Sequence, residues 1–333
     1  MKTSTFCYKE IYFFIIRTLD NCFYKRYYKF SKKLVFQLFR SQLEAQKWKS
    51  LFSSYSKYVI KTPVTKIPTD TLSLEEISFE SDGLTLQGWW LEAQNPRATL
   101  VFVHGAGSSR ISWFFNTLQF YEQLQKAGIS VFTFDQRNHG NSDYTDGYLR
   151  MGAVEHRDVM AAREWVSEQT DNETPLIICG LSMGAATAIY ALAEGVQADA
   201  LLLFDPMLNT RDALAQGGWV GYGLPSALFK PMAYLAPLFW GLPHGENDAL
   251  NVATELELPI AIMQNKDDPI TRSRWSEELD ARSDWVSLTF VPDTEPGHNC
   301  LSDKGRWGTH ASAFHCHPQW TLTQVEQLLA NLE

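Results

Sequence analysis

The chain has 333 residues, of which 45% are hydrophobic and 20% charged, so it can bury the core of one large or two small domains. No segment is low in complexity, and none repeats at a fixed period. The net charge of −9 is unevenly spread, because residues 1–66 hold 14 Lys and Arg against three acids. The acidic remainder argues against nucleic acid as a partner.

Residues 1–70 form a basic, aromatic N-terminal arm and a linker. The apolar run at 11–16 is shorter than the ~20 residues of a membrane span, and no small-residue cleavage site follows it. Aromatic and basic residues alternate over 23–58, where the spacing of Leu34 and Leu38 suits an amphipathic helix. Two interpretations stay open: peripheral contact with an anionic membrane, or a helix that packs on the body of the protein.

The five cysteines form an odd set without C-x-x-C spacing: Cys7, Cys22, Cys179, Cys300 and Cys316. Such a set is typical of a reducing compartment, so the sequence predicts a cytoplasmic protein, in contact with a membrane if the arm binds one. It predicts neither a disulfide framework nor a zinc site, and no cofactor.

Residues 71–333 alternate strand and helix patterns. A hairpin is expected over 77–91, and an edge strand over 286–291. The buried strands are expected at 99–103, 129–134, 176–179, 200–204 and 259–263, with helices at 116–126, 152–168 and 321–332. This alternation predicts an α/β fold with a mostly parallel, doubly wound sheet, whose ligands bind at the carboxyl ends of the strands.

The segment Gly180-Leu181-Ser182-Met183-Gly184 lies between a buried strand and an Ala-rich helix. A G-x-S-x-G pattern in that setting is typical of a nucleophile elbow, a sharp turn that exposes the serine hydroxyl. Gly180 and Gly184 allow the close backbone approach that the turn needs. Ser182 is therefore the candidate nucleophile, and the N–H of Met183 is expected to face an oxyanion.

Five motifs occur in order along the body: HGAG at 104–107, FDQRNHGNSD at 134–143, GLSMG at 180–184, NKDDPIT at 265–271 and PGHN at 296–299. On these motifs the chain resembles serine hydrolases of the α/β-hydrolase superfamily, and is similar to the branch of monoacylglycerol lipase and serine aminopeptidases. The resemblance covers roughly residues 75–332 and leaves the arm outside. It implies an α/β-hydrolase fold with a catalytic triad in the order serine, acid, histidine.

The resemblance implies Asp268 as the triad acid, because Asp268-Pro269-Ile270 matches the family pattern. Asp267 and Asp205 stay open as alternative acids. For the base, the Gly-His loop implies His298.

Downstream, His310, His315 and His317 are interpreted as residues of a polar surface loop, since nothing completes a metal site around them.

The HGAG turn is expected to supply the second oxyanion donor through the backbone of Ala106, beside that of Met183. Gly105 and Gly107 keep this turn narrow, and His104 is expected to brace it. The same bracing role is expected for Asp135, Arg137 and His139.

More than fifty residues separate the strands at 200–204 and 259–263, which predicts an inserted helical cap at about 207–250. Its many aromatic and aliphatic residues fit an acyl-chain pocket or a lid, or else a cap that packs on the body without contacting substrate. The sequence therefore predicts a lipase-like esterase that cleaves a small-molecule carboxylic ester, which would be a lipid if the acyl group is apolar. An aminopeptidase or amidase, and a catalytically silent binding protein, are the alternatives.

Overall fold

A computed structural model describes residues 72–170 and 173–332. The N-terminal arm, with the boundary near residue 70 and the expected membrane contact, lies outside the described residues. Among those described, no helix is both long and apolar enough to cross a bilayer.

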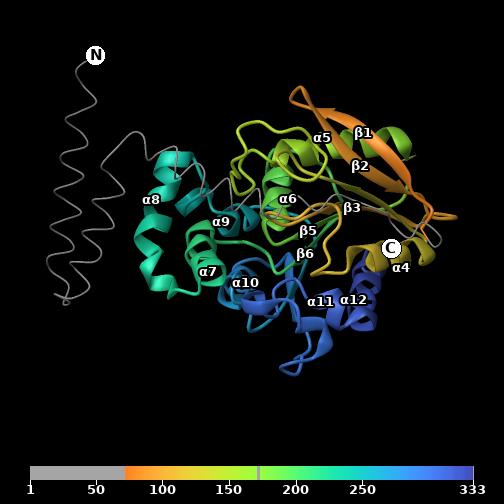
Figure 1. Ribbon diagram of the computed structural model, residues 1–333. Helices are drawn as coiled ribbons and strands as arrows, with labels where there is room; N and C mark the ends of the chain where they lie inside the picture. Colours follow the sequence, from red (N-terminus) through yellow and green to blue (C-terminus); the bar gives the residue numbers. More distant parts are fainter. Residues whose placement is uncertain (1–71, 171–172, 333) are drawn as a thin grey trace, which may run out of the picture. The chain divides into compact units, whose positions relative to one another are not determined.

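The described residues build one eight-stranded sheet in the order β1-β2-β4-β3-β5-β6-β7-β8 (Figure 1). The pairs β1–β2 and β2–β4 are antiparallel, and all other pairs are parallel. The strands are β1 (Glu75–Ser81), β2 (Leu84–Leu91), β3 (Ala98–Val103), β4 (Ile129–Phe134), β5 (Leu176–Leu181), β6 (Ala200–Phe204), β7 (Ile260–Gln264) and β8 (Val286–Phe290). The predicted mostly parallel α/β sheet is confirmed, and it has the α/β-hydrolase fold.

Helices cover both faces of the sheet (Figure 1). One face packs against α5 (His156–Gln169), α6 (Met183–Ala193), α9 (Ala249–Ala253) and α10 (Ser273–Asp280), and the other against α4 (Thr117–Lys126), α11 (Ala313–Cys316) and α12 (Pro318–Ala330). Four short 3-10 helices lie in the connections: η1 (Ser226–Leu228), η2 (Gly245–Asn247), η3 (Asn299–Leu301) and η4 (Gly305–Trp307).

Two hydrophobic cores lie on the two faces of the sheet, because alternate residues of each strand point to opposite sides. In β3, Val101 and Val103 belong to one core, while Leu100 and Phe102 belong to the other. Every residue of β3, β4, β5 and β6 is buried, as is typical of central parallel strands. These rigid strands end at one edge of the sheet, where their loops meet.

The segment 205–259 between β6 and β7, here called the cap segment, carries α7 (Thr210–Tyr222) and α8 (Lys230–Trp240) in addition to η1, η2 and α9. Arg306 ties α7 to the loop before α11, since its Nε donates to the carbonyl oxygen of Val220 at 2.9 Å. On the other side Asp212 pairs with Arg272 at the start of α10. The cap segment is therefore anchored at two points.

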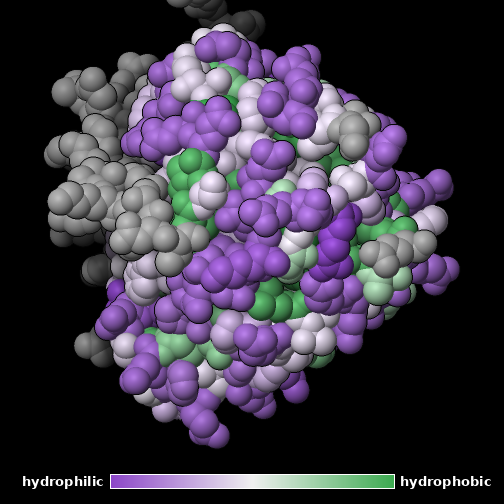
Figure 2. Space-filling view, turned by 90° about the vertical axis from the view of Figure 1, so that its right-hand side faces the viewer, coloured by the Kyte–Doolittle hydropathy of each residue, from purple (hydrophilic) through white to green (hydrophobic). Residues whose placement is uncertain are grey.

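Large apolar side chains of the cap segment are exposed: Trp219, Tyr222, Leu224, Leu228, Tyr234, Leu238, Phe239 and Trp240. Leu238 is the most exposed of them, at 66%. By contrast, the face of the molecule that Figure 2 shows is mainly hydrophilic, with small scattered hydrophobic areas. Over the described residues, eight of the thirteen exposed large apolar side chains therefore lie in the segment from α7 to α8, and the other five are scattered: Trp113, Tyr144, Met160, Trp285 and Phe290.

Cys300 and Cys316 form a disulfide, and the expectation that the chain lacks one is wrong. The two residues are 16 positions apart, but the loop folds back so that their Cα atoms lie 5.5 Å apart. Sequence spacing alone could not reveal this return of the chain. Because disulfides persist in oxidising surroundings, the cytoplasmic location loses the support of the cysteine pattern and stays a prediction.

Candidate active site

Ser182 stands at the sharp turn between β5 and α6, with φ 56° and ψ −117°. Such a conformation is strained for a residue with a side chain, and the close packing of the turn maintains it. A Cβ on Gly180 would lie 2.4 Å from Cα of Ala185, and one on Gly184 would lie 2.1 Å from the carbonyl oxygen of Val103. Only glycine fits at these two positions, so α6 can begin directly against the end of β3.

His310 lies between Ser182 and Asp268. Its Nε2 is 3.0 Å from Oγ of Ser182, and its Nδ1 is 2.6 Å from Oδ2 of Asp268. Asp268 is itself fixed, because its Oδ1 accepts the backbone N–H groups of Ile270 and Thr271 at 2.7 and 2.9 Å. The three side chains thus form a continuous hydrogen-bonded chain that links the ends of β5 and β7 to the loop before α11.

The structure places His298 away from this chain, which corrects the expectation that it is the base. The imidazole of His298 caps η3, where its Nδ1 accepts the backbone N–H of Cys300 at 3.3 Å. The physical reason is an extension of the loop: after the Gly-His turn the chain forms η3 and η4 before it returns to the sheet at His310. The interpretation of His310 as a surface residue is wrong for the same reason, since only 4% of it is exposed.

The sequence around His310 differs from that around His298 in one respect, which does not by itself identify the base. His310 is the last histidine before the small residues Ala311, Ser312 and Ala313, which open the final helical region and are all buried. His315 and His317 are only partly buried and lie beyond this turn. His317 contacts Thr294, with 2.7 Å between its Nε2 and the threonine hydroxyl.

The positions of the two alternative acids, Asp267 and Asp205, distinguish them from Asp268. Asp267 is exposed and no part of the hydrogen-bonded chain, whereas Asp268 is buried within it. Asp205 is fully buried at the end of β6, and its carboxylate binds backbone and amide N–H groups instead of the imidazole.

Burial lowers the pKa of His310, but the Asp268 carboxylate, and to a lesser extent Asp205, outweigh it, so that the pKa is raised overall. An imidazole with this surrounding accepts a proton more readily than one in water. The neighbouring Asp268 oxygen also fixes the tautomer, because Nδ1 must carry its hydrogen to donate to the carboxylate. Nε2 is then free to accept the hydrogen of the Ser182 hydroxyl.

The turn at 104–107 lies beside Ser182. A Cβ on Gly105 would be 3.2 Å from Cβ of Ser182 and 3.7 Å from its Oγ. Two buried histidines hold the turn: His104 Nε2 accepts the N–H of Gln136, and His139 Nε2 accepts the N–H of Gly107, both at 3.1 Å.

Burial lowers the pKa of His104 to about 4 and that of His139 to about 3, so both are neutral near pH 7. Ala106 lies within this turn, and Met183 is the first residue of α6, where N–H groups lack helical partners.

Asp135 and Arg137, which follow β4, are also part of the scaffold around the site. Asp135 is buried and pairs with Arg110 at 2.9 Å, while Arg137 pairs with Asp158 of α5 at 2.6 Å. A Cβ on Gly140 would lie 2.1 Å from the Asp135 carboxylate, so the loop folds tightly around it. These contacts fix the loops on the β4 side of the site.

Asp205, Asp268 and His310 lie close enough to resemble a metal site, with candidate ligand atoms within 4.8 Å of one another. Their lone pairs already have partners, however. Nδ1 of His310 faces Asp268, and both oxygens of Asp205 accept N–H groups. The donor set fits an internal hydrogen-bond network better than a metal ion.

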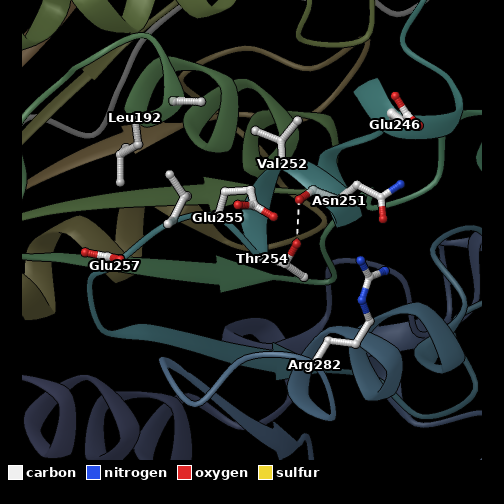
Figure 3. Close-up of a pocket in the computed structure, with 10 residues that line it drawn as sticks. Leu192, Glu246, Asn251, Val252, Thr254, Glu255, Glu257 and Arg282 are labelled. Atoms are coloured by element: carbon white, nitrogen blue, oxygen red, sulfur yellow. Dashed lines mark hydrogen bonds between the residues drawn. The ribbon is translucent and has the colours of Figure 1, made fainter.

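A surface hollow of about 760 Å³ lies elsewhere, between the end of α6, the region of α9 and Arg282 (Figure 3). Its lining includes Leu192, Glu255 and Glu257, and none of the residues around Ser182. It is therefore separate from the candidate active site.

Comparison with known proteins finds a match to the family described as "Serine aminopeptidase, S33" over residues 94–240. A Danio rerio protein named lysophosphatidylserine lipase ABHD12 is 27% identical over 129 residues, which are 37% of this chain and 32% of that protein. A Mycobacterium tuberculosis protein that carries a phosphoribosyl transferase name is 28% identical over 156 residues, covering 43% of this chain and 30% of that one. The chain thus matches about a third of the length of these curated relatives.

Among solved structures, a Pyrococcus furiosus esterase has a TM-score of 0.62 at 20% sequence identity. The similarity covers 81% of this chain and 97% of the esterase. At this identity the likeness concerns the fold.

Proposed function

We propose that this chain, which has the α/β-hydrolase fold, is a serine hydrolase that cleaves carboxylic esters through Ser182, His310 and Asp268. The observation that carries the proposal is the unbroken hydrogen-bonded chain from the Ser182 hydroxyl through both nitrogens of His310 to the Asp268 carboxylate. A serine hydroxyl becomes a useful nucleophile when an oriented base accepts its proton.

In the proposed reaction, Oγ of Ser182 attacks the ester carbonyl carbon while Nε2 of His310 takes the hydroxyl proton. The imidazolium is stabilised by the carboxylate of Asp268. His310 then gives the proton to the leaving alkoxide, and an acyl group remains on Ser182. Water, activated by the same imidazole, hydrolyses this acyl-enzyme and restores the serine.

The backbone N–H groups of Met183 and Ala106 are the proposed donors to the tetrahedral oxyanion. Support comes from the place of Met183 at the start of α6 and from the close approach of the 104–107 turn to Ser182. One such donor contributes about 3–4 kcal/mol to the transition state. The hydrogen bonds of His104 and His139 to this turn and its neighbours would hold the N–H of Ala106 in place.

The proposed substrate is an ester with an apolar acyl chain. The support is the cap segment, which connects two strands that end at the site, β6 and β7, and exposes eight large apolar side chains. The name of the Danio rerio relative, a lipase, agrees with this class. The basic arm is proposed to bring the enzyme to an anionic membrane, which vesicle pelleting of the full chain and of a variant lacking residues 1–66 would test.

Hydrolysis of p-nitrophenyl esters from acetyl to palmitoyl, by wild type and Ser182→Ala, tests the proposal. We expect a preference for medium or long chains and a loss of about 10⁶-fold in turnover in the variant. A preference for acetyl esters would be consistent with the triad but would contradict the proposed pocket for an apolar acyl chain. Equal activity of both proteins would contradict the proposal that Ser182 is the nucleophile.

An aminopeptidase or amidase is the second candidate, because the matching family is described by that activity. Faster cleavage of amino-acid p-nitroanilides than of the matching esters would favour it. A silent binding protein is the third, and it requires that a fluorophosphonate fails to label Ser182.

A further inference from the structure

Asp205 is a buried carboxylate for which the proposed reaction has no direct use. It follows β6, and its two oxygens accept four N–H groups. Oδ1 accepts the backbone N–H of Asn265 at 2.6 Å and Nε2 of Gln264 at 3.1 Å. Oδ2 accepts Nδ2 of Asn265 at 2.7 Å and the backbone N–H of Ala311 at 2.8 Å.

The bond to Ala311 reaches the residue directly after His310. Ala311 has a φ of 55°, a left-handed conformation that is unfavourable for an L-residue with a side chain. A second contact supports the same turn, because Oγ of Ser312 donates to Oδ1 of Asn265 at 3.1 Å. Asp205 and Asn265 together thus hold the backbone on the C-terminal side of the imidazole in a strained turn.

We propose that Asp205 is a positioning residue that joins the histidine loop to the loop of the triad acid and adds a second negative charge beside His310. The proposal rests on the proposed function of Ser182, His310 and Asp268. Asp205 acts on His310 through its hydrogen bond to the backbone N–H of Ala311 and through the electric field of its charge. It touches neither the substrate nor the imidazole ring.

The charged groups around His310 come from three elements. Asp268 follows β7, Asp205 follows β6, and Lys304 belongs to the same loop as the histidine, with its Nζ donating to the His310 carbonyl oxygen at 2.9 Å. The two carboxylates raise the pKa of His310, whereas burial and Lys304 lower it. Asp268 and Asp205 contribute two negative charges, and Lys304 contributes one positive charge. Protonation of His310 therefore brings the net charge of these four side chains to zero.

The hydrogen bonds of the Asp205 carboxyl favour the charge that this role needs. Every hydrogen bond that its carboxyl makes comes from an N–H donor, and such donors favour the ionised form. Burial and the neighbouring Asp268 raise the pKa of Asp205 to about 7. Asp205 is therefore more costly to keep charged than a surface acid, and its N–H partners offset only part of that cost.

The test compares Asp205→Asn with the exposed control Asp267→Asn in the full chain. Removing the charge at 205 should lower kcat on a p-nitrophenyl ester by about 100-fold through misplacement of the imidazole, with little change in KM. It should also move the acid limb of kcat/KM to lower pH, because His310 loses a charge that raises its pKa. In the control, kcat and the acid limb should stay at their wild-type values.

The pKa of His310 measured by NMR titration separates this proposal from the proposed function, since it needs no turnover. A His310 pKa that is lower in Asp205→Asn than in wild type supports the role of the charge even if no ester is cleaved. A pKa equal to that of wild type, or an unchanged kcat, overturns the proposal. If Asp205→Asn does not fold, Asp205→Glu keeps the charge but displaces the carboxylate, and wild-type kcat in that variant would overturn it.

Discussion

Replacing both Cys300 and Cys316 with alanine should lower the free energy of unfolding by about 3 kcal/mol. The disulfide closes a segment of 16 residues, and the entropy of closing such a loop in the unfolded chain gives this magnitude. The closed segment includes His310, the 3-10 helix η4 and the buried Lys304. Loss of the disulfide should therefore also lower kcat, because the loop that positions the imidazole gains conformational freedom.

Urea denaturation with and without dithiothreitol measures this effect, and mass spectrometry after alkylation counts the free thiols. Dithiothreitol should bring the unfolding midpoint of the wild type down to that of the double variant and leave the variant unchanged. A wild type whose midpoint is insensitive to reductant, while its Cys300 and Cys316 thiols are shown to be free afterwards, would refute the reasoning.

Three further outcomes are expected. Burial lowers the pKa of His104 to about 4 from an ordinary value of 6.5, so the unfolded chain binds more protons between these values. The stability that His104 contributes should fall by about 3 kcal/mol as pH decreases from 6.5 to 4, in addition to the fall caused by His139, and a smaller fall in His104→Gln than in wild type checks the assignment. Lys304→Met should move the acid limb of kcat/KM to higher pH, opposite to Asp205→Asn, because Lys304 lowers the pKa of His310; a pH–rate profile decides this. Gly184→Ala should destabilise the protein by about 3 kcal/mol or more, since the new Cβ would meet the Val103 carbonyl, and an unfolding midpoint equal to that of wild type would contradict it.

The fold and the position of Ser182 in a sharp turn could be predicted because local patterns determine them. Continuous apolar runs predict the buried strands, and the residues of β3, β4, β5 and β6 are buried throughout. Glycine is required at positions 180 and 184, because a Cβ there would clash with backbone atoms of the same turn or of the neighbouring strand. Such features depend on residues close in sequence or on burial alone.

The histidine could not be predicted in the same way, because its position depends on the path of a long loop. His298 and His310 both follow the last strand and precede α12, and the loop brings only the second to Ser182. The pairing of Cys300 with Cys316 and the bond from Asp205 to Ala311 follow from the same return of the chain. Such contacts join residues that are far apart in the chain, and the periodic patterns that reveal helices and strands do not reveal them.

The most direct measurement compares ester hydrolysis by His310→Ala and His298→Ala. His310→Ala should lose about 10⁶-fold in kcat, as expected for a triad base. His298→Ala should lose only the cap of η3, about 1 kcal/mol of stability, and keep its turnover. Near-wild-type activity in His310→Ala together with an inactive, folded His298→Ala would contradict the account.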